Sequence, residues 1–176
     1  MGNDNLNIEN LQTDYNIEEQ QLISLSKFIF LSIITFGLYE VWWIYKAWRF
    51  FQQKEKLDIN PAARALFSIL FLNVLFNKIL DFAKTKGYGG SYSPTLLFIG
   101  FIITNLLSRL PDPFWLITVL SFVFLIPPFE ALNFAKQSST DFIVTEQSSF
   151  SVRQIALIVV GAIFWGLILL GLSSKS

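Results

Sequence analysis

The chain has 176 residues, of which 53% are hydrophobic and only 15% are charged. This composition is far from that of a soluble domain of the same length, and it predicts that lipid surrounds most of the chain. Because 13 basic and 13 acidic side chains cancel, no net field would attract nucleic acid, and the lack of cysteine and histidine excludes disulfides, thiolate or imidazole metal sites and histidine-assisted nucleophiles. We therefore expect no cofactor, no metal site, no catalytic residues and no nucleic-acid partner.

The first 27 residues are acidic and rich in Asn and Gln, with Lys27 as their only basic side chain. Such a composition predicts a solvated and largely disordered tail over residues 1–27. A membrane helical domain over residues 28–172 is expected to follow, and residues 173–176 form a short polar tail.

Five hydrophobic segments lie in the membrane domain, and they cover residues 28–48, 62–80, 95–107, 114–129 and 155–172. A membrane span needs about 20 apolar residues, a length that only the first and last segments meet easily. The longest uncharged stretch of the second segment, residues 65–77, would cover only about 20 Å of a hydrocarbon core roughly 30 Å thick. The second segment is therefore predicted to lie in the interface or to re-enter on one side.

The distribution of basic residues supports this arrangement. If all five segments crossed, Lys and Arg would divide six to seven between the two sides. If the second segment stays on one side, they divide ten to three, which is a clear cytoplasmic bias. We predict an all-α integral membrane helical bundle with four spans plus one interfacial or re-entrant helix, both termini outside, in a bacterial inner membrane.

Several local signals predict helix boundaries. Asn60-Pro61 and Asp112-Pro113 each place a capping side chain before a proline, and Ser151 with Gln154 has the spacing of a capping box. The pair Pro127-Pro128 is expected to end the fourth segment. A short amphipathic piece around Asn133 and Lys136 would continue from it.

Glu40 is the most informative single residue, because it lies inside a hydrophobic segment where an unpaired carboxylate is costly. We expect a partner for it, either Arg64 or Lys78 or the amides of Asn73 and Asn77. A pair that locks helices together, an ion or proton site, and a side chain that reaches water remain alternatives. The candidate polar site comprises Glu40, Arg64, Asn73, Asn77 and Asp81.

Aromatic rings meet the first basic residues in the run from Thr35 to Arg49. Rings with a polar edge settle at headgroup depth, and Lys or Arg beyond them reach phosphate, so the run predicts either an interfacial anchor or a binding surface for lipid or a partner helix. The candidate headgroup contacts are Trp42, Trp43, Tyr45, Trp48, Arg49, Lys54 and Lys56.

The last segment contains the Ala162-xxx-Gly166 spacing, which allows a close helix approach. It predicts either packing within the chain or self-association.

Three stretches, residues 32–49, 59–64 and 110–115, together resemble a group of small uncharacterised bacterial multi-span membrane proteins. That group carries a T-F-G-(L/I)-Y-x-x-(W/Y)-W start, an I-S-P-F-W-R segment and an L-P-D-P-(Y/F)-W turn, and the resemblance covers about residues 28–135. This chain has Ala62-Ala63 where the similar proteins have Phe-Trp, which puts any aromatic contact there in doubt. The resemblance implies a membrane fold and no activity.

Two functions follow from these observations. The first is a non-enzymatic membrane protein that acts through membrane lipid or a partner membrane protein, using the aromatic and basic residues of the first two segments. The second is a small channel or transporter with a polar path around Glu40, Arg64, Asn73 and Asn77. Because four spans are too few for a roomy pathway, this alternative requires a homo-oligomer.

Overall fold

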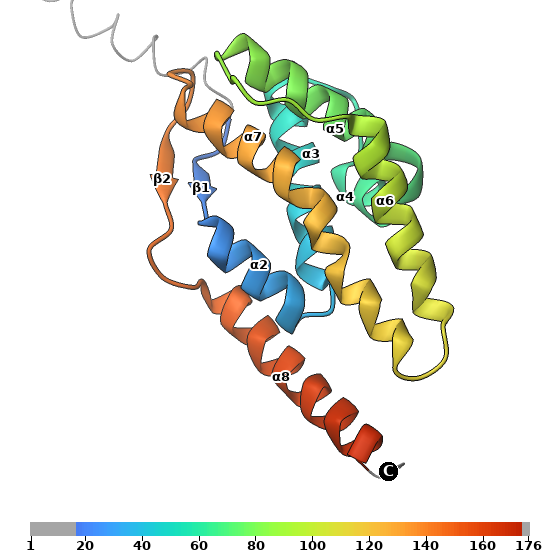
Figure 1. Cartoon of the computed structure of the whole chain (residues 1–176). Helices are drawn as coiled ribbons and strands as arrows, with labels where there is room; N and C mark the ends of the chain where they lie inside the picture. The colour runs from blue at the N-terminus through green and yellow to red at the C-terminus, as the bar shows by residue number, and fades with distance from the viewer. Residues whose placement is uncertain (1–16, 174–176) are drawn as a thin grey trace, which may run out of the picture.

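Helices form nearly all the regular structure of residues 17–173, which are the residues described by the computed structural model (Figure 1). The predicted all-α class is confirmed, and within residues 17–173 the helices are accompanied only by a short two-stranded ladder. The elements are β1 (Gln20–Leu22), α2 (Leu25–Ile34), α3 (Leu38–Glu55), α4 (Pro61–Leu66), α5 (Ser68–Thr85), α6 (Pro94–Leu106), the 3-10 helices η1 (Leu107–Arg109) and η2 (Phe114–Leu125), α7 (Ile126–Gln137), β2 (Val144–Glu146) and α8 (Val152–Ser173).

A sharp turn divides the first predicted segment into α2 and α3. Phe36 and Gly37 both have a positive φ, at 51° and 82°, and this left-handed backbone ends α2. Thr35 joins the two helices, because its Oγ1 donates to Leu31 O at 2.7 Å and accepts from Tyr39 N at 3.0 Å. The Thr-Phe-Gly-Leu-Tyr sequence therefore encodes the turn of a helical hairpin.

Aromatic packing confirms that α2 folds back along α3. The Phe28 ring, from the first turn of α2, lies 5.8 Å from the Trp43 ring and 4.4 Å from the Phe129 ring of α7. All three side chains are buried. The prediction of one continuous helix over residues 28–48 is wrong, because the chain reverses at Gly37 and both outer ends of the hairpin lie toward the same end of the molecule (Figure 1).

The parallel ladder ties the N-terminal segment to the connection before α8. Gln20, Gln21 and Leu22 pair with Val144, Thr145 and Glu146, respectively. Lys27 Nζ donates to Gln147 O and Ser148 O, both at 2.6 Å.

This pairing corrects two predictions. Residues 17–27 have a defined conformation, with Leu22 and Ile23 in the core, whereas the remaining residues of the two predicted tails, 1–16 and 174–176, lie outside the described part of the chain. The four-span topology placed the N-terminal segment and the 137–150 connection on opposite sides of the membrane. Because the two segments are hydrogen-bonded to each other, that placement is wrong.

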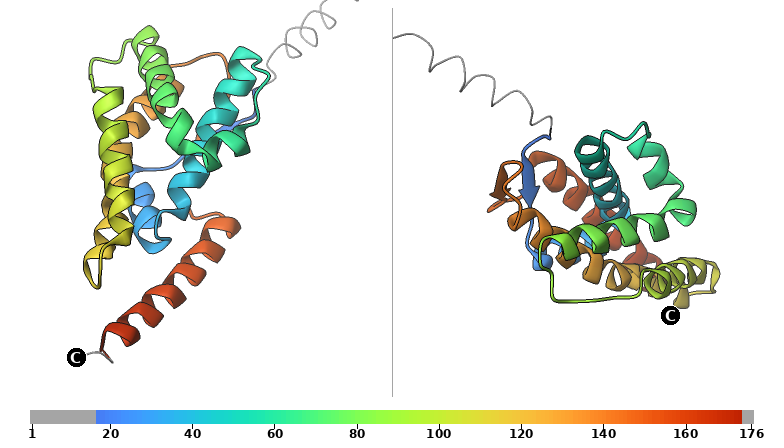
Figure 2. Two further views of the ribbon diagram at one scale, coloured as in Figure 1. Left: turned by 90° about the vertical axis from the view of Figure 1, so that its right-hand side faces the viewer. Right: turned by 90° about the horizontal axis from the view of Figure 1, so that it is seen from above.

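The second predicted segment forms α4 and α5, and α5 packs on α3 and α7 at one end of the molecule (Figures 1 and 2). Asn60 Oδ1 caps α4 by accepting from Ala63 N at 3.1 Å, as predicted. Phe82 of α5 packs against the rings of Phe50 and Phe51 at the end of α3.

Helix α6 descends from this end and returns as η2, and the two pack side by side (Figure 2). At the turn, Trp115 Nε1 donates to Asp112 Oδ1 at 2.9 Å, while Pro113 takes the N-cap position of η2. The predicted break at Pro127-Pro128 is wrong. Both prolines lie in the first turn of α7, where a missing N–H costs little, and the helix runs on to Gln137.

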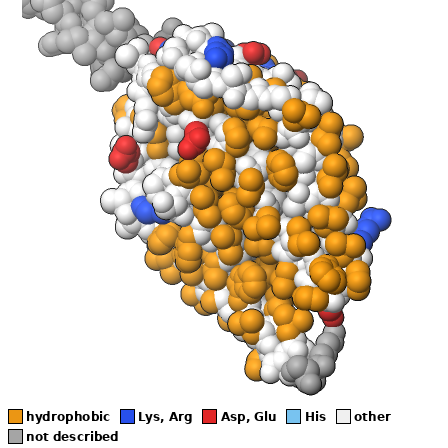
Figure 3. Space-filling view, viewed as in Figure 1, with side chains coloured by type: hydrophobic (Ala, Val, Ile, Leu, Met, Phe, Trp, Pro, Cys, Tyr) orange, Lys and Arg blue, Asp and Glu red, His pale blue; other side chains and the backbone are white. Residues whose placement is uncertain are grey.

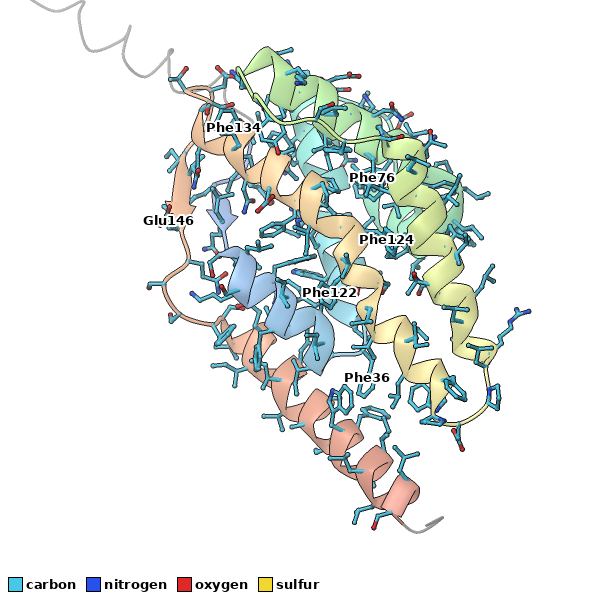
Figure 4. The ribbon with its side chains drawn as sticks, in the orientation of Figure 1. Phe36, Phe76, Phe122, Phe124, Phe134 and Glu146 are labelled. Carbon is cyan, nitrogen blue, oxygen red and sulfur yellow. The ribbon has the colours of Figure 1, made fainter. Side chains whose placement is uncertain are left out.

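Two helical stretches, Phe114–Gln137 and Val152–Ser173, are long and apolar enough to cross a membrane, which indicates membrane association. Hydrophobic side chains gather over the middle and lower part of the face in Figure 3, while charged ones lie mostly above them or at the margins. Helix α8 contacts the hairpin at few points. Trp165 Nε1 donates to Ile33 O at 3.2 Å, and its ring stacks on Phe36, which points toward α8 (Figure 4).

Candidate functional site

Glu40 has a partner that the sequence analysis did not name. The carboxylate is 2% exposed in the first turn of α3, and Ser121 Oγ of η2 lies 3.0 and 2.9 Å from its two oxygens. Neither a basic side chain nor the amides of Asn73 and Asn77 contact it among the described residues. The expected pairing with segment two is therefore wrong, and Glu40 instead joins the hairpin turn to η2.

The other members of the predicted polar site are dispersed. Arg64 stacks its guanidinium over the Trp48 ring at 4.4 Å and lies 5.1 Å from the Phe71 ring. Asn77 Nδ2 donates within its own helix to Asn73 O at 2.8 Å.

Asp81 is exposed on α5, close to Tyr92 in the loop that precedes α6. Burial, with smaller contributions from Tyr88 and Asp81, raises the pKa of Tyr92. The structure therefore does not bring the five predicted residues into one path.

The predicted headgroup contacts on α3 divide into buried and accessible side chains. Trp48 is fully buried beneath Arg64, and Trp43 is in the core, so neither ring is free to reach a membrane surface. Trp42 is 38% exposed. The half-buried Tyr45 accepts from Arg49 Nη1 at 3.0 Å.

Two of the three basic candidates already have partners inside the fold. Arg49 pairs with Glu18, and Lys54 Nζ lies 4.9 Å from the centroid of the Phe82 ring. Lys56 is exposed at the C-cap of α3. The linear run of aromatic and basic residues therefore does not form one continuous surface.

A cavity of about 940 Å³ lies between β1, α3, α7 and the first turns of α8. This is at the upper end of the range typical of small-molecule sites, roughly 300–1,000 Å³. Its apolar lining includes Trp42, Trp43, Phe129, Leu157 and Val160.

The rim of the cavity is accessible from outside the protein, because Trp42 on α3 and Val160 on α8 are 38% and 45% exposed. A ligand can therefore enter between these two helices.

A polar network closes the cavity beside the start of α8. Ser151 and Gln154 form the predicted capping box, with Ser151 N donating to Gln154 Oε1 at 2.9 Å and Gln154 N to Ser151 Oγ at 3.3 Å. Gln154 Nε2 also donates to Tyr39 Oη at 3.0 Å, and Gln147 Nε2 donates to Gln154 Oε1 at 2.7 Å. The network joins the hairpin, the loop after β2 and α8 at the cavity wall.

Three cations line the same cavity, namely Lys46, Lys136 and Arg153. None of them has a side-chain hydrogen bond or ion pair within residues 17–173. The two acids in the lining are engaged elsewhere, because Glu18 pairs with Arg49 and Glu19 Oε1 accepts from Thr145 Oγ1 at 2.8 Å. The cavity therefore combines an apolar wall with three basic side chains that have no hydrogen-bonded or ion-paired partner among the described residues.

The described residues contain no group of three or more acidic side chains arranged to hold a metal ion. Sequence reasoning missed Ser121, Lys46 and Arg153 as site residues, and it noted Lys136 without assigning it a role. A single basic residue on a helix carries no local signal of burial. Its role becomes visible only when α3, α7 and α8 are placed around one space.

Comparison with known families gives one match. A domain of unknown function, DUF4234, matches residues 23–109, from the end of β1 to the end of η1. No curated protein and no solved structure matches the chain. The match agrees with the resemblance to an uncharacterised family over the hairpin and the following helices, while η2, α7 and α8 lie beyond it.

Proposed function

We propose that this chain is a non-enzymatic, multi-pass protein of the bacterial inner membrane that binds a membrane amphiphile in the cavity between α3, α7 and α8. One observation carries the proposal. A large cavity with an apolar wall, three basic side chains and a hydrogen-bonded polar network opens between two helices, and hydrophobic side chains cover much of the face in Figure 3. An amphiphile has the same two-part chemistry.

The proposed arrangement in the membrane has three crossings, made by α6 with η1, by η2 with α7, and by α8. The apolar stretch Pro94–Arg109 is shorter than the other two but reaches about 26 Å as 13 α-helical and three 3-10 residues. The α2–α3 hairpin enters the membrane from one side and returns, and α5 packs at that same side.

The charges support an orientation. Basic residues of α2, of α3 and of the end of α5 bond to the segment before β1 or to the connection between α7 and α8, through Lys27 with Gln147, Arg49 with Glu18 and Lys86 with Asp141. Arg109 lies at the other end, where α6 turns into η2. Because positive charge accumulates on the cytoplasmic side, we place β1 and α5 in the cytoplasm and the end of α8 outside.

The structure gives no support to a polar path for ions. Glu40 faces Ser121, Arg64 faces aromatic rings, and Asn77 bonds to its own helix. The homo-oligomeric channel is therefore not proposed.

A cavity-filling variant tests amphiphile binding. Ala156 lines the cavity, so Ala156→Trp should occupy its space, whereas Ala162→Trp adds the same side chain to an exposed position of α8 outside the lining. The protein is purified from membranes in a mild detergent, and native mass spectrometry measures the bound amphiphile.

We expect wild type and the Ala162→Trp variant to retain about one bound amphiphile per chain, and the Ala156→Trp variant to lose it. Retention by Ala156→Trp at the wild-type level would contradict binding in this cavity. Absence of any bound amphiphile from the wild-type protein would contradict the proposed function.

A further inference from the structure

We infer that the occupant of the cavity is an anionic phospholipid, with its phosphate between Lys46 and Lys136 and one acyl chain along α8. The inference rests on the proposed function, and it adds the chemical class of the ligand and the residues that select it.

Lys136 provides the strongest reason to expect an anionic ligand. It is 7% exposed at the end of α7, and its Nζ lies 4.6 Å from the centroid of the Phe50 ring. A single ring face compensates little of the cost of burying an ammonium group. No carboxylate, carbonyl or hydroxyl of residues 17–173 accepts a hydrogen bond from this nitrogen, although three donors are available on it. Lys136 is among the residues that line the cavity, so a ligand there can supply the acceptor that residues 17–173 do not.

Lys46 adds a second positive charge beside the first. It lies near enough to Lys136 for their charges to act on each other, and both side chains line the cavity. Two like charges in one partly buried space repel, so a bound anion removes the repulsion and satisfies donors on both groups. Arg153, at the start of α8, also lines the cavity, but it lies toward the opposite end of α3: its neighbour Gln154 bonds Tyr39 in the first turn of α3, whereas Lys136 lies against Phe50 further along that helix.

The remaining lining distinguishes a lipid from a small free anion. Leu157 and Val160 line the cavity four and seven residues beyond Arg153, so α8 contributes an apolar wall about 10 Å long. On the opposite wall, Trp43 and Phe129 are aromatic and apolar. A free phosphate would use only the cationic end, whereas a phospholipid fills both.

The experiment compares lipids that differ in headgroup charge. Purified full-length protein in detergent receives an equal mixture of phosphatidylglycerol and phosphatidylethanolamine with matched acyl chains, and native mass spectrometry measures the ratio bound. Inorganic phosphate, added in excess in a separate arm, tests whether a free anion competes. The variants are Lys136→Gln and Lys46→Gln, with Lys84→Gln as a control, because Lys84 is an exposed lysine of α5 outside the cavity.

We expect wild type and the Lys84→Gln variant to prefer phosphatidylglycerol, and each cavity variant to reduce that preference about tenfold, as expected for one lost charge-assisted contact. Inorganic phosphate should not displace the lipid. Equal binding of the two lipids by wild type, or an unchanged preference in both cavity variants, overturns the inference while leaving amphiphile binding intact. Displacement by phosphate would likewise overturn it and indicate a free-anion site.

Thermal unfolding of each variant identifies any that does not fold. Since Lys46 is only half-buried, the Lys46→Gln variant tests the preference for phosphatidylglycerol if Lys136→Gln proves unstable.

Discussion

Ser121 Oγ lies within 3.0 Å of both carboxylate oxygens of Glu40, although the two residues are 81 positions apart in the chain. The contact fastens η2 to the turn between α2 and α3. Both groups are buried, at 3% and 2% exposure, so the hydroxyl is the carboxylate's main compensation for leaving water. Ser121 thus provides a buried polar link between η2 and the α2–α3 hairpin.

Removal of this hydroxyl should destabilise the protein. Ser121→Ala leaves the buried Glu40 side chain without its hydrogen-bond partner, and a buried polar group left unsatisfied costs about 1–3 kcal/mol. Glu40→Gln should be milder than Glu40→Ala, because the amide oxygen still accepts from Ser121 and no space is left empty. Chemical unfolding in mild detergent measures the unfolding free energy of all three variants, with Ser91→Ala in the exposed loop as the control. Equal stability of Ser121→Ala and wild type would contradict this account of Glu40.

Substitution of Gly37 in the hairpin turn should destabilise the protein. An alanine there must keep a φ of +82°, which costs an L-residue roughly 1–2 kcal/mol, although its Cβ would meet the Glu40 carboxylate only at an ordinary 3.5 Å. We expect Gly37→Ala to lower the unfolding free energy by about that amount. Gly89→Ala provides the comparison, because that glycine has no positive φ and nothing within 4 Å of the added Cβ. A similar loss in both variants would argue against backbone strain as the cause.

Helix type and several helix starts could be predicted from the sequence, because they depend on local chemistry. Asn60 and the Ser151–Gln154 box cap helices as their spacing indicates, since each cap involves residues only three positions apart. The division of the first segment at Gly37 could not be read from hydropathy, which is continuous there. The signal was the Thr-Phe-Gly run, whose left-handed backbone ends a helix however apolar its neighbours are.

The candidate site was less predictable, because its residues come from elements that are distant in the chain. Three single basic residues line the cavity, and for each of them the sequence alone predicts a solvated side chain: Lys46 in the middle of α3, Lys136 near the end of α7 and Arg153 at the start of α8. The same limit applied to Glu40, for which charge complementarity suggested a basic partner while packing supplied a hydroxyl. The predicted membrane topology was wrong for a related reason, since the pairing of β1 with β2 joins residues more than 120 positions apart.

Alanine substitution at two glycines of α8 should have different effects on stability. A Cβ at Gly161 would lie 2.0 Å from Ile34 O, so Gly161→Ala must push α8 away from the end of α2, at a cost of about 1–3 kcal/mol. Gly166 has nothing within 4 Å, and alanine there gains helix propensity of up to about 1 kcal/mol. Thermal midpoints in detergent should fall for Gly161→Ala and stay or rise for Gly166→Ala. If Gly166→Ala falls instead, the close approach predicted from Ala162-xxx-Gly166 is used in self-association, and size measurement of that variant would show a smaller species.

Tyr92 should contribute a stabilising contact that weakens at alkaline pH. Its hydroxyl donates to Phe76 O at 2.9 Å, so Tyr92→Phe should lose about 1 kcal/mol at pH 8. Because folding raises the pKa of Tyr92 above its ordinary value of 10.0, its contribution is complete below that value and declines as the pH rises through it. The difference in thermal midpoint between wild type and variant should therefore shrink between pH 8 and pH 11. A constant difference would show that Tyr92 does not titrate as its surroundings indicate.

The pairing of β1 with β2 predicts which side of the membrane the N-terminal segment occupies. Gln21 and Thr145 are partners in the ladder and both are exposed, and neighbouring strands lie about 4.8 Å apart, within the Cα separation that a disulfide bridges. Since the natural chain has no cysteine, the double variant Gln21→Cys with Thr145→Cys reports on this pair alone. We expect oxidation in membranes to produce an internal cross-link, detected as a change in electrophoretic mobility, whereas Gln21→Cys with Arg109→Cys should produce none.

A membrane-impermeant maleimide added to intact cells should label the Arg109→Cys variant and leave the Gln21→Cys and Thr145→Cys variants unlabelled. Labelling of the thiols introduced at Gln21 and Thr145 from opposite sides would contradict the hairpin topology and restore a first segment that crosses the membrane.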